Sequence, residues 1–181
     1  GVGFAMEHFD VIIVGAGISG VSAAVHVGRE CPDKSYCVLE RRESVGGTWD
    51  LFKYPGIRSD SDMHTLGFNF KPWKESKSIA DGPAILKYVK ETTQEYGVDK
   101  NIKFSHKLTN AQWSSHDAKW TLDVDHASEQ VQISCNFLFM CSGYYSHDEV
   151  HDPGIDGVEN FSGDVVNPQF WPDGLVHKGK R

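Results

Sequence analysis

The stretch FDVIIVGAGISG, residues 9–20, decides the fold that we expect for this chain of 181 residues. FDVIIV is a continuous β-branched run that predicts a buried strand, and a helical pattern follows from Val21 to about Arg29. A second apolar run, SYCVLE at residues 35–40, predicts another strand that ends on a carboxylate. Strand, glycine turn, helix and strand together make a βαβ unit, which requires a parallel sheet.

The turn GAGISG has the GxGxxG pattern, with Gly15, Gly17 and Gly20. Between a strand and a helix this pattern indicates a dinucleotide site: Gly15 permits the tight turn, Gly17 lets the backbone approach a pyrophosphate, and Gly20 allows close helix packing. Glu40, at the end of the second strand, can accept hydrogen bonds from ribose hydroxyls and disfavours a 2′-phosphate. The site therefore favours NAD or FAD over NADP, and a purely structural glycine turn is the competing interpretation.

The loop that follows, ERRESVGGTW, indicates which of the two cofactors, NAD or FAD, the site binds. It places Gly46 and Gly47, then Thr48 and Trp49, directly after the acidic residue. These residues would bring further backbone N–H groups and an aromatic ring to a long bound cofactor. The loop therefore favours FAD.

The rest of the chain predicts an α/β protein with an added β-meander. Pro83 begins a helix that Gly97 ends. Three strand-like pieces follow at residues 107–115, 119–126 and 129–143, and their short polar turns predict an antiparallel meander. The apolar end of the last piece, Phe137 to Cys141, is expected to return to the buried parallel sheet.

The region between these elements, residues 41–73, lacks clear periodicity and is expected to be a long functional loop with a short helix near residues 62–66. The fold class is thus a Rossmann-like domain with a parallel sheet and an inserted antiparallel β-meander. GVGFA before Met6 lacks the features of a secretory signal, and we expect residues 1–6 to be an expression remnant or disordered.

Composition excludes several classes of function. A formal net charge of -7 without a Lys/Arg run disfavours nucleic acid or an anionic membrane as partner, and the apolar runs are too short to span a bilayer. The four cysteines form no CxxC pair, which disfavours a flavin disulfide reductase and favours a reducing, cytoplasmic setting. His147 and His151 lie where a helix is not expected, so we predict no metal site.

Four ordered motifs carry a resemblance to a known family. They are GAGISG, LERRESVGGTW, YPGIRSDSDMHTLGFNFKPW and FSGDVVNPQFW at residues 161–171, which has the form FxGxxxNxxxW. Together they resemble class B flavoprotein monooxygenases of the Baeyer–Villiger type, and the third motif is most similar to the ethionamide-activating subgroup. The resemblance runs from about residue 7 to residue 180.

The resemblance implies cofactors and residue roles. FAD would be held by the first glycine motif, Glu40 and Arg41, with Gly47, Thr48 and Trp49 as the flavin-side loop. Leu108 and Cys141 match positions where the backbone passes close to adenine and pyrophosphate. Asp60 matches an active-site aspartate that pairs with a catalytic arginine, although a helix N-cap reinforced by Asp62 is the other interpretation of this residue.

The resemblance also implies a division of the chain. Residues 7–145 would be the N-terminal part of the FAD domain, and residues 146–181 would lead toward an NADPH domain with a second GxGxxG that this chain does not contain. We therefore expect a fragment that is inactive alone. Asn167 stands where the family usually has histidine, which would affect coupling between the two domains.

The implied activity is NADPH- and O2-dependent oxygenation of a ketone or a thioether through a peroxyflavin. Two alternatives stay open: an N-hydroxylating or general flavin-containing monooxygenase, and a non-catalytic binding module with a flavoprotein fold. Neither the substrate nor the oligomeric state follows from the sequence.

Overall fold

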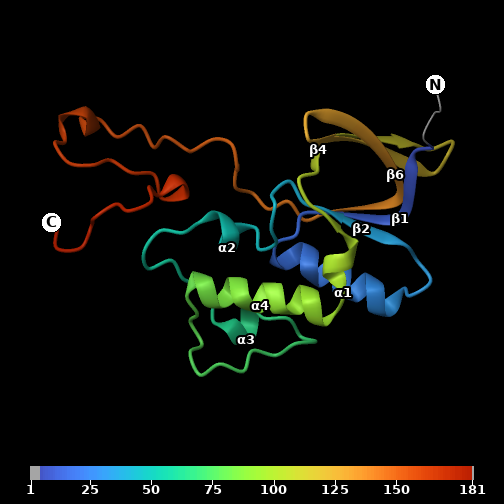
Figure 1. Ribbon diagram of the computed structural model, residues 1–181, viewed down its shortest axis with the longest axis horizontal. Coiled ribbons are helices and arrows are strands. Elements are labelled where there is room, and N and C mark those ends of the chain that lie inside the picture. The colour runs from blue at the N-terminus through green and yellow to red at the C-terminus, as the bar shows by residue number, and fades with distance from the viewer. Residues whose placement is uncertain (1–4, 181) are drawn as a thin grey trace.

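In the computed structural model, which describes residues 5–180, the strands form a single six-stranded sheet with the two long helices beside it (Figure 1). The strands are β1 (Glu7–Val14), β2 (Tyr36–Leu39), β3 (Ile102–Lys103), β4 (Lys107–Ser114), β5 (Lys119–His126) and β6 (Glu129–Met140), in the spatial order β3-β2-β1-β6-β5-β4. Strands β3, β2, β1 and β6 pair in parallel, whereas β6, β5 and β4 pair antiparallel.

The expected βαβ unit and meander are thus both confirmed, and β6 belongs both to the parallel part of the sheet and to the meander. Its first half pairs with β5, and its second half continues alongside β1, from Ile133 opposite Glu7 to Met140 opposite Val14. The meander is therefore an extension of the same sheet, not a separate layer. The two-residue strand β3 was not predicted, because two residues carry no alternation signal.

The helices are α1 (Ile18–Glu30), α2 (Thr48–Leu51), α3 (Met63–Leu66) and α4 (Gly82–Glu95), with 3₁₀ turns η1 (Val98–Asn101), η2 (Val158–Asn160) and η3 (Pro168–Phe170). Both long helices lie on the same side of the sheet (Figure 1). Within residues 5–180, no helix combines the length and the apolar character needed to cross a membrane.

Helix α4 has the start and stop signals that the sequence indicates. The Asp81 side chain accepts a hydrogen bond from Ala84 N at 3.0 Å, and Pro83 lies in the first turn. The helix ends before Gly97, whose φ of +68° is favourable for glycine. Local sequence chemistry therefore sets both ends of this helix.

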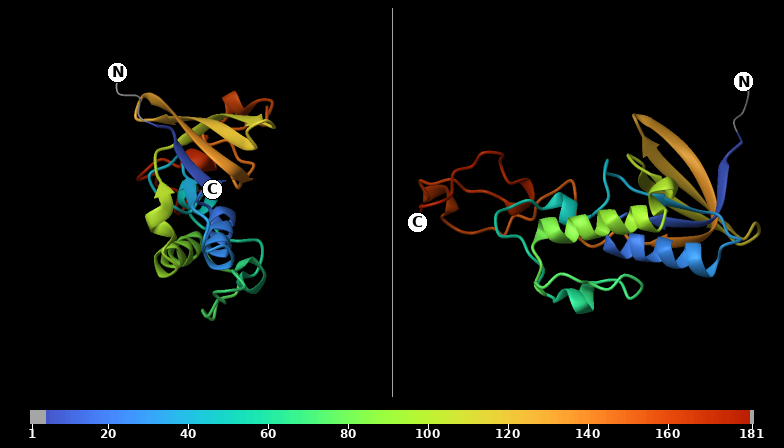
Figure 2. Two further views of the ribbon diagram at one scale, coloured as in Figure 1. Left: turned by 90° about the vertical axis from the view of Figure 1, so that its right-hand side faces the viewer. Right: turned by 60° about the horizontal axis from the view of Figure 1, so that its bottom comes forward.

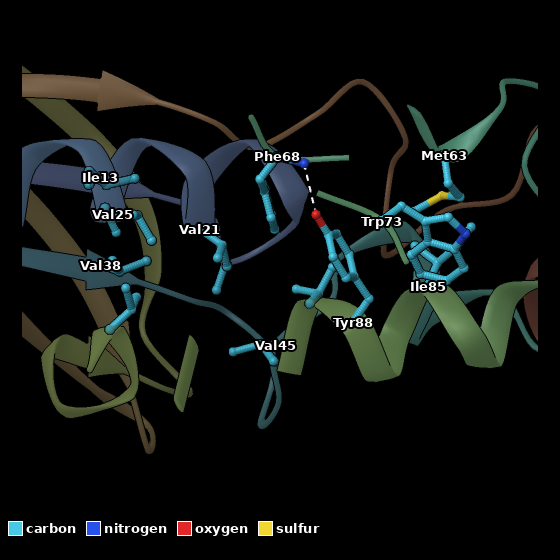
Figure 3. Packing of buried hydrophobic residues seen from close by; sticks show 14 of the residues in the cluster. Ile13, Val21, Val25, Val38, Val45, Met63, Phe68, Trp73, Ile85 and Tyr88 are labelled. Carbon is cyan, nitrogen blue, oxygen red and sulfur yellow. Dashed lines mark hydrogen bonds between the residues drawn. The ribbon is translucent and has the colours of Figure 1, made fainter. Parts of the chain in front are cut away.

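Two hydrophobic clusters, one on each side of the parallel strands, stabilise the fold. The cluster between sheet and helices includes Ile13, Val21, Val38 and Ile85, all 1% exposed or less, and extends into the long loop (Figure 3). The second cluster joins β1 and β2 to the meander. The curled meander thus covers one face of the parallel strands, and the helices cover the other face.

The long loop between α2 and α4 is held in place by Tyr88 of α4. Its buried hydroxyl accepts a hydrogen bond from Phe68 N at 2.9 Å (Figure 3). It also donates one to Lys71 O at 2.5 Å. The Phe68 ring stacks on Tyr88 with centroids 5.3 Å apart. These contacts anchor the segment without sequence periodicity to α4.

The apolar end of β6 departs from the prediction. Phe137, Phe139 and Met140 are between 43% and 56% exposed, so the expectation that this run is buried was wrong. β5 pairs only as far as Cys135, and beyond that point β6 has β1 as its neighbour. The run is apolar and pairs in parallel with β1 as expected, but several of its side chains are exposed to solvent.

The segment after β6 runs away from the sheet as an exposed coil that carries η2 and η3 (Figures 1 and 2). Asn167 caps η3, because its side chain accepts a hydrogen bond from Gln169 N at 3.0 Å. Gln169 Nε2 in turn donates to Ser146 O at 2.7 Å. Asparagine therefore has a local structural role at the position where histidine was expected.

A pair of glycines in α1 tests the close contact between helix and turn. A Cβ atom on Gly20 would lie 1.7 Å from the Gly15 carbonyl oxygen, whereas one on Gly28 would meet Tyr36 at an ordinary 3.6 Å. We expect Gly20→Ala to lower the free energy of unfolding by about 3 kcal/mol or more. Gly28→Ala should leave it unchanged or raise it by up to about 1 kcal/mol, through helix propensity. Urea unfolding followed by circular dichroism measures both, and equal stabilities would contradict the packing role of Gly20.

Candidate functional site

A groove of about 850 Å³ lies at the carboxyl ends of β1, β2 and β6. This is the edge of a parallel sheet at which open α/β folds bind ligands. Nine of the residues predicted from the sequence line the groove: Gly15, Gly17, Glu40, Arg41, Gly47, Thr48, Trp49, Leu108 and Cys141. Gly20 and Asp60 do not line it.

The glycine turn is fixed by backbone hydrogen bonds to three other segments. Gly15 N donates to Leu39 O at 2.8 Å, Cys141 N donates to Val14 O at 2.8 Å, and Gly46 N donates to Ala16 O at 2.9 Å. Gly15 has a φ of +106°, and a Cβ atom there would lie 2.4 Å from the Cys141 carbonyl oxygen. Only glycine satisfies both conditions.

The N-terminus of α1 faces this groove without a side-chain cap. Gly17 is the N-cap residue, and the first backbone hydrogen bond of the helix runs from Val21 N to Gly17 O. The N–H groups of the first turn are therefore available to an anion, which the helix dipole also attracts. A Cβ atom on Gly17 would lie 3.6 Å from Gly47 Cα, so the two glycine segments are in contact and together line one part of the groove, which we name the cradle.

The Glu40 carboxylate organises the end of β2. The residue is 3% exposed, and its two oxygens accept hydrogen bonds at 3.2 Å from Ala16 N and Arg42 N. It therefore joins the glycine turn to the next loop. Each carboxylate oxygen has a further lone pair that can accept a hydroxyl from the groove.

Asp50 holds the Gly46–Gly47 loop in shape, and sequence reasoning missed it. Its carboxylate accepts hydrogen bonds from Ser44 Oγ at 2.7 Å and Arg42 Nη2 at 2.8 Å. Burial alone would raise the pKa of Asp50, but the hydrogen bonds from Arg42 and Ser44 outweigh it and lower the pKa. The sequence signal that could have revealed Asp50 is its position in the first turn of α2, a helix that begins directly after two glycines.

The wall of the groove that faces the glycine turn is formed by the connection between β3 and β4. Ser105 N donates to Arg42 O at 3.0 Å, and His106 N donates to Glu40 O at 2.9 Å. These bonds bring His106 and Leu108 beside the end of β2, although more than 60 residues of sequence separate them from it.

Asp60 lies outside the groove, in the loop before α3. The alternative interpretation of Asp60 as a helix N-cap was wrong, because Asp62 holds that position and accepts hydrogen bonds from His64 N and Thr65 N. Asp60 is exposed. The pKa of the Tyr145 phenol, which lines the groove, is raised first by Tyr144 and to a smaller extent by the negative charge of Asp60. Asp60 is thus near the groove without forming its wall.

The sequence did not reveal two further residues at the groove, because they lie in the coil after β6. His147 lines the groove, and Asp148 pairs with Arg41 at 2.5 Å and with Lys107 at 3.1 Å. No local pattern in the sequence marks these residues as neighbours of β2 or β4.

Comparison with known proteins agrees with this geometry. The family described as NAD(P)-binding Rossmann-like domain matches residues 13–81. A protein of Mycolicibacterium smegmatis named FAD-containing monooxygenase EthA is 55% identical over 175 residues, which are 97% of this chain and 36% of the relative. A Mycobacterium tuberculosis protein named putative FAD-containing monooxygenase MymA is 48% identical over 177 residues, covering 97% and 36%.

Solved structures give the same result. A structure described as oxidized steroid monooxygenase bound to NADP superposes with a TM-score of 0.76 at 30% identity, covering 93% of this chain and 32% of that one. A structure of OTEMO in complex with FAD and NADP gives a TM-score of 0.73 at 29% identity, covering 92% and 31%.

The fold and the glycine-lined groove define a Rossmann-like dinucleotide-binding unit. Over nearly its whole length this chain is similar to proteins named FAD-containing monooxygenases, and its structural neighbours are Baeyer–Villiger monooxygenases. It spans about 36% of the length of the curated relatives that it matches.

The lowered pKa of Asp50 gives a pH-dependent prediction. A carboxylate whose pKa is lower in the folded state contributes stability above its unfolded value of about 4, and this contribution is lost as the pH falls through the folded pKa. We expect Asp50→Asn to lower the free energy of unfolding at pH 7 by about 1–3 kcal/mol and by less near pH 3. Chemical unfolding at several pH values measures this, and a loss that does not depend on pH would contradict it. Asp33→Asn, at an exposed site, is the control.

Proposed function

We propose that this chain is the FAD-binding portion of an NADPH- and O2-dependent flavin monooxygenase. The observation that carries the proposal is the part of the groove lined by Gly17 and Gly47, two glycines in contact with each other that present backbone, without side chains, to a ligand. The names and bound ligands of the relatives, which contain FAD and NADP, support the same assignment.

The residues present fit a dinucleotide diphosphate. The uncapped first turn of α1 would donate N–H groups to the phosphates, since a helix N-terminus favours an anion. Glu40 would accept the ribose hydroxyls, and Arg41 would lie beside them. Leu108 and Cys141 would contribute backbone at the adenine and the pyrophosphate, with Thr48 and Trp49 at the flavin side.

FAD would supply the redox chemistry and the activation of dioxygen, and the chain would supply orientation and charge. We assign Asp60 the role of fixing the position and charge of an arginine near the flavin, since a carboxylate can hold a guanidinium in a bidentate pair. The exposure of Asp60 leaves its carboxylate accessible to such a partner. The substrate would be a small ketone or thioether.

The division of the chain follows from the same proposal. Residues 7–145 form the N-terminal part of the FAD domain, and residues 146–181 connect it to an NADPH domain. We also propose a cytoplasmic location, for which the four free cysteines are the support.

The cradle gives a direct test of FAD binding. Gly17 has a negative φ of -77°, so alanine is compatible with its backbone, and the added Cβ makes only ordinary contacts within the protein. We expect Gly17→Ala to fold normally but to bind FAD at least tenfold more weakly, because a side chain at this glycine would keep the backbone from approaching the pyrophosphate closely. Flavin fluorescence titration of the chain measures the affinity, with Gly28→Ala as control. If the unsubstituted chain binds no FAD, the proposed function is wrong.

The role of Asp60 requires a turnover assay on the full-length protein that contains this chain. We expect Asp60→Asn to reduce ester formation from a cyclic ketone by about 10- to 100-fold, which corresponds to about 1.4–2.7 kcal/mol, while the FAD content stays unchanged. Asp62→Asn removes a carboxylate two residues away and serves as the control. Product analysis by gas chromatography gives the rate, and an unchanged rate for Asp60→Asn would exclude the residue from catalysis.

A further inference from the structure

The coil that follows β6 crosses the outer edge of the groove before it leaves the domain. Ser146 and His147 line the groove, and Asp148 comes directly after them. The carboxylate of Asp148 bridges two cations from different elements, with one oxygen 2.5 Å from Arg41 Nη2 and the other 3.1 Å from Lys107 Nζ. Residues 146–148, which we name the strap, therefore tie the end of β2 to the start of β4.

The two cations lie where an adenosine ribose would bind. Arg41 follows Glu40, the residue that would accept the ribose hydroxyls, and Lys107 precedes Leu108 on the opposite wall. Arginine and lysine at this place in a dinucleotide site are the groups that accommodate a 2′-phosphate. Here both are neutralised by the same carboxylate, and Glu40 adds a second negative charge.

His147 adds a polar group that lacks a partner. Its Nδ1 atom is buried and makes no hydrogen bond with any residue in the range 5–180. Burial lowers the pKa of the His147 imidazole, and the nearby Arg41 and Arg42 lower it further, so the ring is neutral near pH 7. A buried nitrogen without a partner is unfavourable, and the ring would gain by turning it toward a ligand in the groove.

We propose that the strap contributes to nucleotide specificity: Asp148 competes for Arg41 and Lys107 and so weakens their binding of a 2′-phosphate, while His147 contacts the adenosine. This inference rests on the proposed function, because it concerns the same groove. The carboxylate of Asp148 is 57% exposed, and ion pairs this exposed contribute little to stability. The strap can therefore open to admit a nucleotide without unfolding the domain.

The test compares two nucleotides that differ by one phosphate. Binding of ADP and of 2′,5′-ADP to the 181-residue chain is measured by isothermal titration calorimetry at low salt. The unsubstituted chain should prefer ADP. Asp148→Asn frees both cations and should shift the ratio of affinities toward 2′,5′-ADP by about five- to tenfold, and added salt should reduce that shift.

Glu149→Gln is the matched control for charge. It removes the same negative charge one residue away, but its carboxylate makes no ion pair with Arg41 or Lys107 among the described residues. A general electrostatic effect would change the ratio equally in both variants. A shift in Asp148→Asn that does not exceed the shift in Glu149→Gln would overturn the proposal.

The contact assigned to His147 is tested in the same assay. His147→Ala should weaken ADP binding by about fivefold, the loss expected for one hydrogen bond. His151→Ala, at an exposed position four residues later, should bind as the unsubstituted chain does. Equal ADP affinities for the two variants would overturn the contact, and thermal unfolding without ligand checks that both variants are folded.

The experiments distinguish an error in the specificity assigned to the strap from an error in the proposed function. If the unsubstituted chain binds neither FAD nor ADP, the proposed function is wrong and the strap falls with it. If it binds both but the strap variants behave like their controls, the groove holds FAD and only the specificity assigned to the strap is wrong.

Discussion

The structure depends on one close backbone contact, where the start of α1 and the end of β6 meet the glycine turn after β1. Side chains at Gly15 or Gly20 would overlap backbone atoms, at 2.4 Å from the Cys141 carbonyl oxygen and 1.7 Å from the Gly15 carbonyl oxygen. This contact sets the position of the helix on the sheet and leaves the first turn of the helix open toward the groove. The same constraint thus produces both the packing of the domain and the site for an anion.

The sequence predicted the elements that carry a local signal. β1, α1 and β2 follow from apolar runs around GAGISG, and α4 follows from Pro83 and Gly97. The strand β3 and the exposure of the β6 end were not predictable in this way. β3 exists because the chain after η1 lies beside β2, and exposure depends on which elements lie nearby in space.

The residues of the candidate site were likewise only partly predictable from the sequence. Nine of the eleven predicted residues line one groove. Eight of them follow the carboxyl ends of neighbouring strands or belong to the glycine turn, and Leu108 joins them from the start of β4. The residues that the sequence did not reveal act through contacts between distant segments: Asp50 with Arg42, and Asp148 with Arg41 and Lys107. Such ion pairs have no periodicity, so only the folded chain shows them.

The walls of the groove therefore differ in how firmly they are held. The glycine turn that supports the cradle is fixed by short backbone hydrogen bonds, and its Gly15 and Gly20 leave no room for a Cβ atom, so the cradle cannot widen without disturbing the sheet. The strap is held by exposed ion pairs, which are screened by salt and can exchange with water. A nucleotide could thus enter past the strap while the cradle keeps its shape. Because rigidity at the cradle lowers the entropy lost on binding, affinity would come from the cradle, and the charges of the strap would determine which nucleotide stays.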